Sequence, residues 1–334
     1  MGKTKTKLLT DLNTFNNLNI PSTPLHRLNR ISELLDVDIW IKRDDLIPFC
    51  GGGNKARMMA HKVREIEQQN CDAVVTAGPT QSNHARVTAL LSASKGWKCK
   101  LILHGSKRDL ENPNGNLLLM LLSGAEVEIV DKDEIRKSVE SSLSVLKNKG
   151  YTPYEIHGGE NLTGSIAYFE AVKELRKQCD NADWIPEWIV HASATGTTQA
   201  GILLGINNIS WDANVIGISA ARKNPRGCNV VKDKCEELAQ ILSIDLGKHP
   251  VTVDFKDNWV GEGYGLTNRK TNNAIRFLAS NEGIILDPTY TGKAFAGLLD
   301  LVNTKEITPG DRVLFWHTGG MYNLFSSEYT WEMT

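Results

Sequence analysis

The sequence predicts an α/β protein of two lobes, each with a parallel β-sheet as its core. Short apolar runs of strand length alternate with segments whose apolar residues recur at helical spacing. This alternation is typical of βαβ units, which form parallel sheets. The length of 334 residues is too great for one small core. Glycine-rich turns after several strands indicate the crevice in which such sheets bind ligands.

The individual elements follow from the same patterns along the chain. Helical spacing over 25–34 predicts a first helix, and the charged triplet at 43–45, after the first strand, is expected to face solvent. Glycines at 96, 124 and 150 are the expected ends of later helices. The expected strands are 37–42, 73–75, 101–103, 127–130, 154–156, 188–191, 215–218 and 313–316. The further expected helices begin near Lys55, after 81–84 and at Leu117, then cover 134–148, 164–179, 202–206, 230–242, 267–280 and 292–301.

Composition and charge exclude several classes of protein. The net charge of −1 gives no electrostatic basis for binding nucleic acid or an anionic membrane. The sequence has no apolar run of the ~18 residues that a membrane-spanning helix needs, and residues 1–20 lack the apolar segment of a secretory signal. Six scattered cysteines without a C-x-x-C pair indicate a reducing compartment. We therefore expect a cytoplasmic protein, and the histidine spacing predicts no metal site.

The stretch Gly51-Gly52-Gly53-Asn54-Lys55 is the first candidate for chemistry. Three consecutive glycines suit a backbone that must adopt positive φ or pass close to another group. The lysine follows at the start of an expected helix, where the positive end of the macrodipole favours a free amine over an ammonium. A free lysine amine attacks carbonyl groups and forms Schiff bases. The alternative is a flexible loop with a solvated lysine.

A second candidate is the run of small and hydroxylated residues at 193–198, between an expected strand and an expected helix. Free backbone N–H groups, hydroxyl donors and the helix dipole together would form a cup for a phosphate group. The alternative is an ordinary capped turn, because Ser and Thr are common helix caps. The sequence has neither a P-loop nor a G-x-G-x-x-G fingerprint, so it carries no nucleotide-binding motif.

Four further turns carry polar residues or glycines. Residues 81–84 suit the binding of an anion or a carboxylate, or serve as a helix cap. Residues 287–293 form a tight turn into a helix, in which Lys293 is a less suitable Schiff-base candidate because it lies inside the helix. Residues 317–320 follow the last strand, at the edge where parallel sheets bind ligands. Residues 261–265 present a tyrosine among three glycines. A Schiff-base lysine and a phosphate cup together are what a pyridoxal phosphate enzyme needs.

Over nearly its whole length the chain resembles the D-cysteine desulfhydrase / 1-aminocyclopropane-1-carboxylate deaminase family of fold-type-II pyridoxal phosphate enzymes. The motifs that carry the resemblance are Lys42-Arg43-Asp44-Asp45, Gly52-Gly53-Asn54-Lys55, Gln81-Ser82-Asn83-His84, Gly263-Tyr264-Gly265, Leu286-Asp287-Pro288, Tyr290-Thr291-Gly292-Lys293 and His317-Thr318-Gly319-Gly320. The resemblance implies a two-domain, tryptophan synthase β-like fold and a homodimer. Residues 55–157 would form an inserted small domain, and 1–54 with 158–334 the large cofactor-binding domain.

The resemblance also implies a role for each matching position. Lys55 would hold the cofactor covalently and move the Cα proton, and Asn83 would hydrogen-bond the cofactor's ring oxygen. Thr318, or else Thr291, would meet the ring nitrogen. The expected catalytic residues are Lys55, Ser82, Tyr264 and Tyr290; the expected cofactor-binding residues are Lys55, Asn83, Gly196, Thr197, Thr198, Thr318 and Thr291; the expected substrate-binding residues are Gln81, Ser82, Asn83 and His84.

The implied reaction is α,β-elimination on a small amino acid, as in the conversion of D-cysteine to pyruvate, ammonia and sulfide. Thr291 stands where members that act on the cyclopropane substrate resemble Tyr-Glu-Gly-Lys. A neutral hydroxyl at the ring nitrogen leaves it unprotonated, which suits elimination of a leaving group. The alternatives are 1-aminocyclopropane-1-carboxylate deaminase, a cysteate sulfo-lyase, a β-replacing amino-acid synthase and a non-catalytic amino-acid-binding protein. Departures from the family pattern at Gly51 and at 56–59 leave the substrate open.

Overall fold

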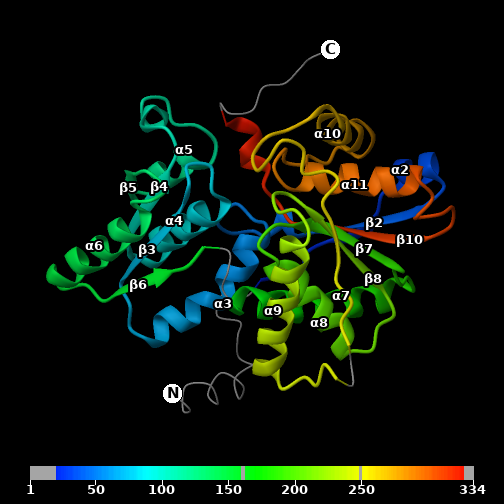
Figure 1. Ribbon diagram of the computed structural model, residues 1–334, viewed down its shortest axis with the longest axis horizontal. Coiled ribbons are helices and arrows are strands. Elements are labelled where there is room, and N and C mark those ends of the chain that lie inside the picture. The colour runs from blue at the N-terminus through cyan, green and yellow to red at the C-terminus, as the bar shows by residue number, and fades with distance from the viewer. Residues whose placement is uncertain (1–19, 159–161, 248–249, 327–334) are drawn as a thin grey trace.

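The computed structural model describes residues 20–158, 162–247 and 250–326. Within these ranges the chain forms two sheet units side by side, with helix α3 (Asn54–Gln68) between them (Figure 1). Residues 1–19, which cover most of the segment used to argue against a secretory signal, lie outside the described residues, as do 327–334. In the part that is described, every helix is too short or too polar to cross a membrane.

The larger sheet has, among the described residues, six strands in the order β1-β2-β10-β7-β8-β9. Strand β1 pairs antiparallel with β2, and the remaining pairs are parallel. The parallel core agrees with the predicted α/β class. The strands are β1 (Leu25–Arg27), β2 (Asp38–Arg43), β7 (Trp188–Ser193), β8 (Asn214–Ser219), β9 (Asp254–Lys256) and β10 (Arg312–His317).

Both faces of this sheet are buried, as a parallel sheet requires. Along β10, Val313 and Phe315 pack into the core on one face, and Leu314 and Trp316 pack into the core on the other. Helices cover both faces of the sheet (Figure 1). The first face is covered by α2 (Asn29–Leu35), α10 (Arg269–Glu282) and α11 (Thr291–Asn303), and the second by α7 (Leu162–Ala182), α8 (Thr197–Asn208) and α9 (Arg226–Leu242).

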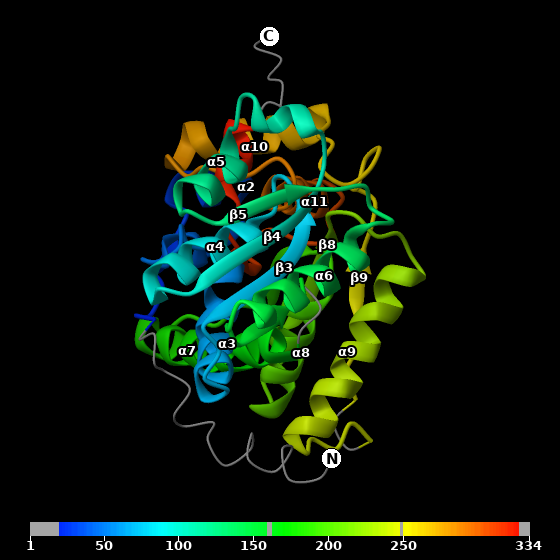
Figure 2. The same cartoon turned by 90° about the vertical axis from the view of Figure 1, so that its left-hand side faces the viewer.

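The smaller sheet has, in the described ranges, four parallel strands in the order β5-β4-β3-β6, of which β5, β4 and β3 are labelled in Figure 2. Helix α6 (Ile135–Asn148) packs on one face, and α3, α4 (Asn83–Lys95) and α5 (Gly115–Leu122) pack on the other. This unit follows β2 and precedes β7 in the chain, so it interrupts the larger sheet in sequence. Its strands are β3 (Ala73–Pro79), β4 (Lys98–His104), β5 (Glu126–Ile129) and β6 (Pro153–Ile156).

Two local expectations are wrong, and one strand was not predicted. Leu25 belongs to β1 rather than to a helix, because it pairs with Lys42 of β2, and the helix starts four residues later. The triplet at 43–45 does not face solvent: Asp44 is fully buried in the short helix η2 (Asp44–Leu46). Strand β9 was not expected, since its three residues carry only one buried apolar side chain, Phe255.

Candidate active site

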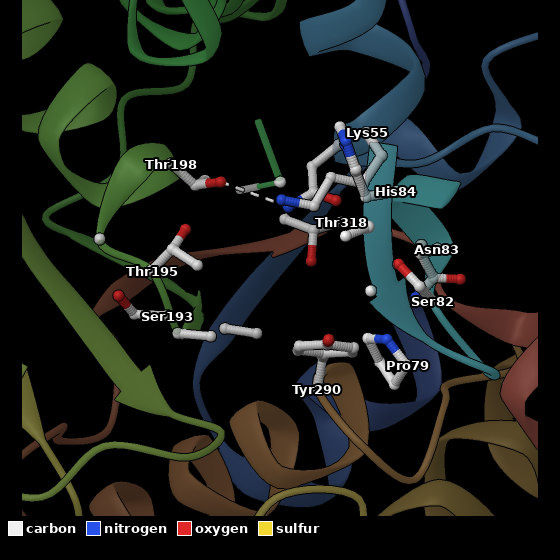
Figure 3. A pocket seen from close by; sticks show the side chains of 18 residues that line it. Lys55, Pro79, Ser82, Asn83, His84, Ser193, Thr195, Thr198, Tyr290 and Thr318 are labelled. Carbon is white, nitrogen blue, oxygen red and sulfur yellow. Dashed lines mark hydrogen bonds between the residues drawn. The ribbon is translucent and has the colours of Figure 1, made fainter. Parts of the chain in front are cut away.

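A cavity of about 270 Å³ opens where the larger sheet ends against the smaller unit (Figure 3). Lys55 and Tyr290 lie at its two ends. Hydroxyl-bearing side chains line one side, and the residues that begin α4 line the other. The lining residues are Asn54, Lys55, Ala77, Gly78, Pro79, Ser82, Asn83, His84, Gly158, Ala192, Ser193, Ala194, Thr195, Gly196, Thr198, Tyr290, Thr318 and Gly319. Among these described residues none is acidic, so the cavity suits an anionic ligand.

Lys55 reaches the cavity from the first turn of α3. The preceding Gly53 has φ +87°, and a Cβ there would lie 2.8 Å from Thr318 O, so a side chain is excluded at this position. The Asn54 N–H donates to Thr318 O at 2.8 Å and fixes the helix start against β10. Burial, and secondarily the charge of Lys234, lower the pKa of Lys55 to about 8. About a tenth of this amine is therefore unprotonated at pH 7 and about half at pH 8, far more than for an ordinary lysine.

The first turn of α3 is held by a buried ion pair. The Arg57 guanidinium donates to both carboxylate oxygens of Asp44, at 2.7 and 2.9 Å, and to Glu174 at 2.9 Å. Burial alone would raise the pKa of Asp44, but Arg57 outweighs it and lowers that pKa to about 2. Tyr168 adds a hydroxyl donor to Asp44 at 2.7 Å. This network is the structural reason for the motif at 42–45: it locks the helix that carries Lys55.

The N-terminus of α8 faces the cavity opposite α4. Gly196 is its N-cap with φ +79° and has no side chain to make a capping hydrogen bond, so this helix N-terminus, with its positive dipole end, suits an anion. Thr195 and Thr198 add hydroxyls, and Asn54 Nδ2 donates to Thr198 Oγ1 at 3.3 Å. Ser193 Oγ is buried and lacks a hydrogen-bond partner among the described residues. Such an orphaned hydroxyl beside a helix N-terminus suits a bound phosphate.

Ser82, Asn83 and His84 line the opposite wall. Ser82 is the N-cap of α4 and accepts from Ala85 N at 3.1 Å, so the capping alternative is also true. Its hydroxyl proton is still available to a ligand. His84 Nε2 lies 3.1 Å from Thr76 Oγ1, and burial, then the charge of Lys55, lowers the pKa of His84 to about 3. His84 is therefore neutral.

Tyr290 closes the far end of the cavity, and its hydroxyl shares a short hydrogen bond with that of Tyr264. Burial, and then Tyr264, raise the pKa of Tyr290 well above its usual value. Lys293 is not in the cavity: it donates to the carbonyls of Val260 at 2.7 Å and Gly263 at 2.8 Å. It thereby anchors the loop that carries Tyr264, although burial lowers its pKa to about 8 as well.

The structure separates the two threonines that were both considered for the ring nitrogen. Thr318 lines the cavity at the end of β10. Thr291 is fully buried, and its hydroxyl donates to Asp287 Oδ1 at 2.7 Å and accepts from Asp287 N at 2.9 Å. Thr291 therefore has no access to the cavity.

Three other expected site residues lie beside the cavity rather than in it. Thr197 is buried, with its hydroxyl 3.1 Å from that of Thr195. Gln81 and Tyr264 line a neighbouring pocket of about 190 Å³, which shares Pro79 with the main one. Ser193 and Thr195 belong to the predicted phosphate cup at 193–198, although only Gly196, Thr197 and Thr198 are individually expected to bind the phosphate, and Asn54 has no predicted role as a ligand-binding residue. Their position in the glycine-lysine stretch and in the hydroxyl-rich turn was the available signal.

The residues of the cavity fit pyridoxal phosphate. The cofactor carries an aldehyde, a phosphate and a ring with an oxygen and a nitrogen that form hydrogen bonds. Lys55 supplies the amine, and the N-terminus of α8 with the orphaned Ser193 hydroxyl supplies an anion site. Asn83 and Thr318 supply polar groups for the ring.

Comparisons with known proteins agree with this geometry. The family model described as pyridoxal-phosphate dependent enzyme matches residues 17–319. The D-cysteine desulfhydrase of Salmonella choleraesuis (strain SC-B67) is 34% identical over 313 residues, which cover 91% of this chain and 93% of that protein. The D-cysteine desulfhydrase of Salmonella newport (strain SL254) is 33% identical over the same shares.

Solved structures extend the likeness to three dimensions. A crystal structure described as an ACC deaminase homologue superposes with a TM-score of 0.85 at 33% identity, over 96% of each chain. A hydrogen sulfide-producing enzyme from Fusobacterium nucleatum gives a TM-score of 0.64 at 18% identity, over 95% of this chain and 99% of that one, and shares the fold. With a family model and relatives that span most of its length, the chain belongs to the pyridoxal-phosphate dependent enzyme family.

Proposed function

We propose that this protein catalyses the α,β-elimination of D-cysteine or a close relative and releases pyruvate, ammonia and sulfide. In the net reaction the Cα–H and Cβ–S bonds break, sulfur leaves as hydrogen sulfide, and one water replaces the nitrogen, which leaves as ammonia. The atoms balance without an oxidant or a reductant. The observation that carries the proposal is that Lys55, an amine with a lowered pKa, shares one cavity with the N-terminus of α8.

Bound pyridoxal phosphate supplies an electron sink that stabilises negative charge at the Cα of an amino acid. Lys55 would hold the cofactor and, when free, take the proton from Cα, since its lowered pKa makes it a base near neutral pH. The backbone of Gly196 and the hydroxyls of Thr195 and Thr198 would hold the phosphate. Asn83 would donate to the ring oxygen.

Ser82 and the tyrosine pair would act on the substrate. The Ser82 hydroxyl accepts from the α4 backbone, so its own proton can be donated to a substrate carboxylate. The Tyr290 hydroxyl remains protonated because its pKa is raised, so it can donate to a leaving group. The bonded hydroxyl of Tyr264 can in turn supply a proton to Tyr290.

Thr318 would face the ring nitrogen. A hydroxyl is neutral and does not hold that nitrogen protonated, so it weakens the electron sink and favours substrates whose leaving group carries the charge away. None of the described cavity-lining residues is Asp or Glu, which would do the opposite. This feature supports β-elimination of a thiol over opening of a cyclopropane ring.

A substrate screen tests the proposal. Both enantiomers of cysteine and of related amino acids are incubated with the holoenzyme, and pyruvate, ammonia and sulfide are measured separately. We expect equal amounts of all three from D-cysteine. Ammonia with 2-oxobutanoate from the cyclopropane substrate would instead favour the activity suggested by the ACC deaminase homologue. Consumption of a second nucleophile without ammonia would indicate a synthase, sulfite from cysteate a sulfo-lyase, and a yellow protein without turnover a binding protein.

We also propose that the protein works in the cytoplasm as a homodimer on small amino acids. We propose residues 55–157 as the small domain and residues 1–54 with 158–334 as the large domain, because the two sheets divide along these bounds. Residues 1–19, 159–161, 248–249 and 327–334 of the large domain lie outside the described ranges. Light scattering coupled to size exclusion tests the dimer: a mass near twice 37.0 kDa is expected, and a mass near 37.0 kDa would contradict it.

A further inference from the structure

A row of three asparagine amides joins the two sheet units and ends at the cavity. Asn323 lies in the short helix η4 (Met321–Phe325) after β10, and Asn116 lies in the first turn of α5 in the smaller unit. Asn116 Nδ2 donates to Asn323 Oδ1 at 2.7 Å and to Asn83 Oδ1 at 3.1 Å. Asn116 is fully buried and Asn323 nearly so. A buried bond between residues 207 positions apart couples the two units directly.

The row begins at a group that can only accept. Asp287 is fully buried, and its Oδ2 accepts from Asn323 Nδ2 at 3.3 Å. The carboxylate oxygens of Asp287 already accept from the backbone N–H groups of Thr289, Tyr290 and Thr291 at 2.7–3.0 Å, so the amide nitrogen of Asn323 faces Asp287 as a further donor. The oxygen of Asn323 is therefore turned toward Asn116. The reversed amide would place oxygen against carboxylate and nitrogen against nitrogen.

Asn116 has only one satisfactory orientation. Its Nδ2 faces three acceptors: Asn323 Oδ1, Asn83 Oδ1 and the carbonyl of Gln81, the last at 3.0 Å. Its Oδ1 accepts from the Arg86 guanidinium at 3.4 Å. A reversed amide would set an oxygen among three acceptors and a nitrogen against a cation. The buried environment makes such mismatches costly.

The hydrogen bonds from Asn116 and Arg86 set the orientation of the Asn83 amide. Its Oδ1 is occupied by Asn116 Nδ2 at 3.1 Å and by Arg86 Nη1 at 3.4 Å. Since both neighbours are donors, the Asn83 nitrogen is turned away from them, and Asn83 lines the cavity opposite Thr198 (Figure 3). The side chain therefore offers the cavity a donor rather than an acceptor.

We propose that Asn116 and Asn323 are positioning residues. The relay of hydrogen bonds that starts at the acceptor Asp287 and passes through Asn323 and Asn116 across the two units fixes the amide orientation of Asn83, so that the nitrogen of Asn83 donates toward the cavity. The consequence for catalysis rests on the proposed function, in which that donor meets the cofactor's ring oxygen. The reactive part of the cofactor is then presented correctly only when the two units are docked through Asn116 and Asn323.

A double-mutant cycle on cofactor binding tests the relay. Pyridoxal phosphate is titrated into apoprotein, and Kd and the position of the visible absorption band are measured for wild type, Asn83→Ala, Asn116→Ala and the double variant. We expect Asn83→Ala to raise Kd about tenfold and Asn116→Ala about fivefold, the range of one lost hydrogen bond. Because Asn116 acts through Asn83, the double variant should match Asn83→Ala alone. Asn281→Ala, which removes an amide bonded to Phe277 O in α10, is the control.

Asn116→Asp sharpens the test. The carboxylate keeps the shape and can still pair with Arg86, but it presents an acceptor to Asn83 and should turn the Asn83 oxygen toward the cavity. Its Kd should then exceed that of Asn83→Ala. If this variant does not fold, the alanine cycle decides. The relay would be overturned if the effects of Asn83→Ala and Asn116→Ala on Kd multiply in the double variant, or if Asn116→Ala leaves Kd unchanged. A wild-type protein that binds no cofactor would instead overturn the proposed function.

Discussion

Gly53 and Gly319 meet backbone to backbone: a Cβ on Gly319 would lie 2.6 Å from Gly53 Cα. One glycine precedes α3 and the other follows β10, so the contact brings the start of the first element to the end of the second. Lys55 and Thr318, each within two residues of this contact, consequently line the same cavity. Any side chain at either glycine would push the lysine away from the threonine.

The lowered pKa of Lys55 predicts how the apoprotein takes up its cofactor. The free amine is the nucleophile, and the amine is protonated below its pKa of about 8. The rate of cofactor uptake should therefore fall about tenfold for each pH unit below 8 and level off above it. Stopped-flow measurement of the visible band between pH 6.5 and 9.5 checks this. A rate that decreases as the pH rises through 8 would contradict the assignment.

The two threonines should respond differently to truncation. Thr318→Ala removes a hydroxyl from the cavity, so it should shift the visible band of the holoenzyme and lower kcat. Thr291→Ala removes two bonds to Asp287, so it should cost about 1–3 kcal/mol of unfolding free energy and leave the band unchanged. Absorption spectra and chemical denaturation of both variants separate the effects. The reverse pattern would assign the ring contact to Thr291.

The tyrosine pair should behave as one unit. Tyr290→Phe removes the hydroxyl at the cavity and should lower kcat on D-cysteine by about 10² or more. Tyr264→Phe breaks the same hydrogen bond, and the double variant should lose little more than Tyr290→Phe. Steady-state kinetics with Tyr151→Phe, an exposed tyrosine on the smaller unit, as the control gives the comparison. Effects that multiply would show that the two hydroxyls act separately.

The buried ion pair under α3 should dominate stability. Arg57→Met leaves the buried Asp44 carboxylate without its main partner and should lower the free energy of unfolding by about 3–5 kcal/mol. Arg136→Met breaks exposed ion pairs with Glu140 and Glu155 and is the matched control, with an expected loss far smaller than that of Arg57→Met. Urea denaturation measures both. Equal losses in the two variants would show that burial does not decide the cost.

Local sequence signals predicted the parts of the site that one segment supplies. The glycine-lysine stretch that ends at Lys55 and the hydroxyl-rich turn at 193–198 each lie between a strand and a helix, and Lys55 and most of that turn line one cavity. Periodicity located most strands and helices for the same reason, because helical and strand spacing are properties of short windows.

Features that depend on distant partners could not be read from the sequence. The sequence predicts that Asp44 faces solvent, whereas in the structure it binds Arg57 and Tyr168, which lie 13 and 124 positions away in the chain. The unexplained Gly51 has a partner at the other end of the chain: a Cβ there would lie 2.7 Å from the ring of Tyr322. The choice between Thr318 and Thr291 likewise depended on Asp287, whose carboxylate binds Thr291.

Replacement of Lys55 tests the central claim most directly, with Lys293 as the matched control because burial lowers both lysine pKa values to about 8. Each variant is purified with pyridoxal phosphate, and the visible band and turnover of D-cysteine are recorded. We predict that Lys55→Ala loses the covalent visible band and all turnover, whereas Lys293→Met keeps the band and loses activity only through the Tyr264 loop. A Lys55→Ala protein that retains both band and turnover would contradict the account.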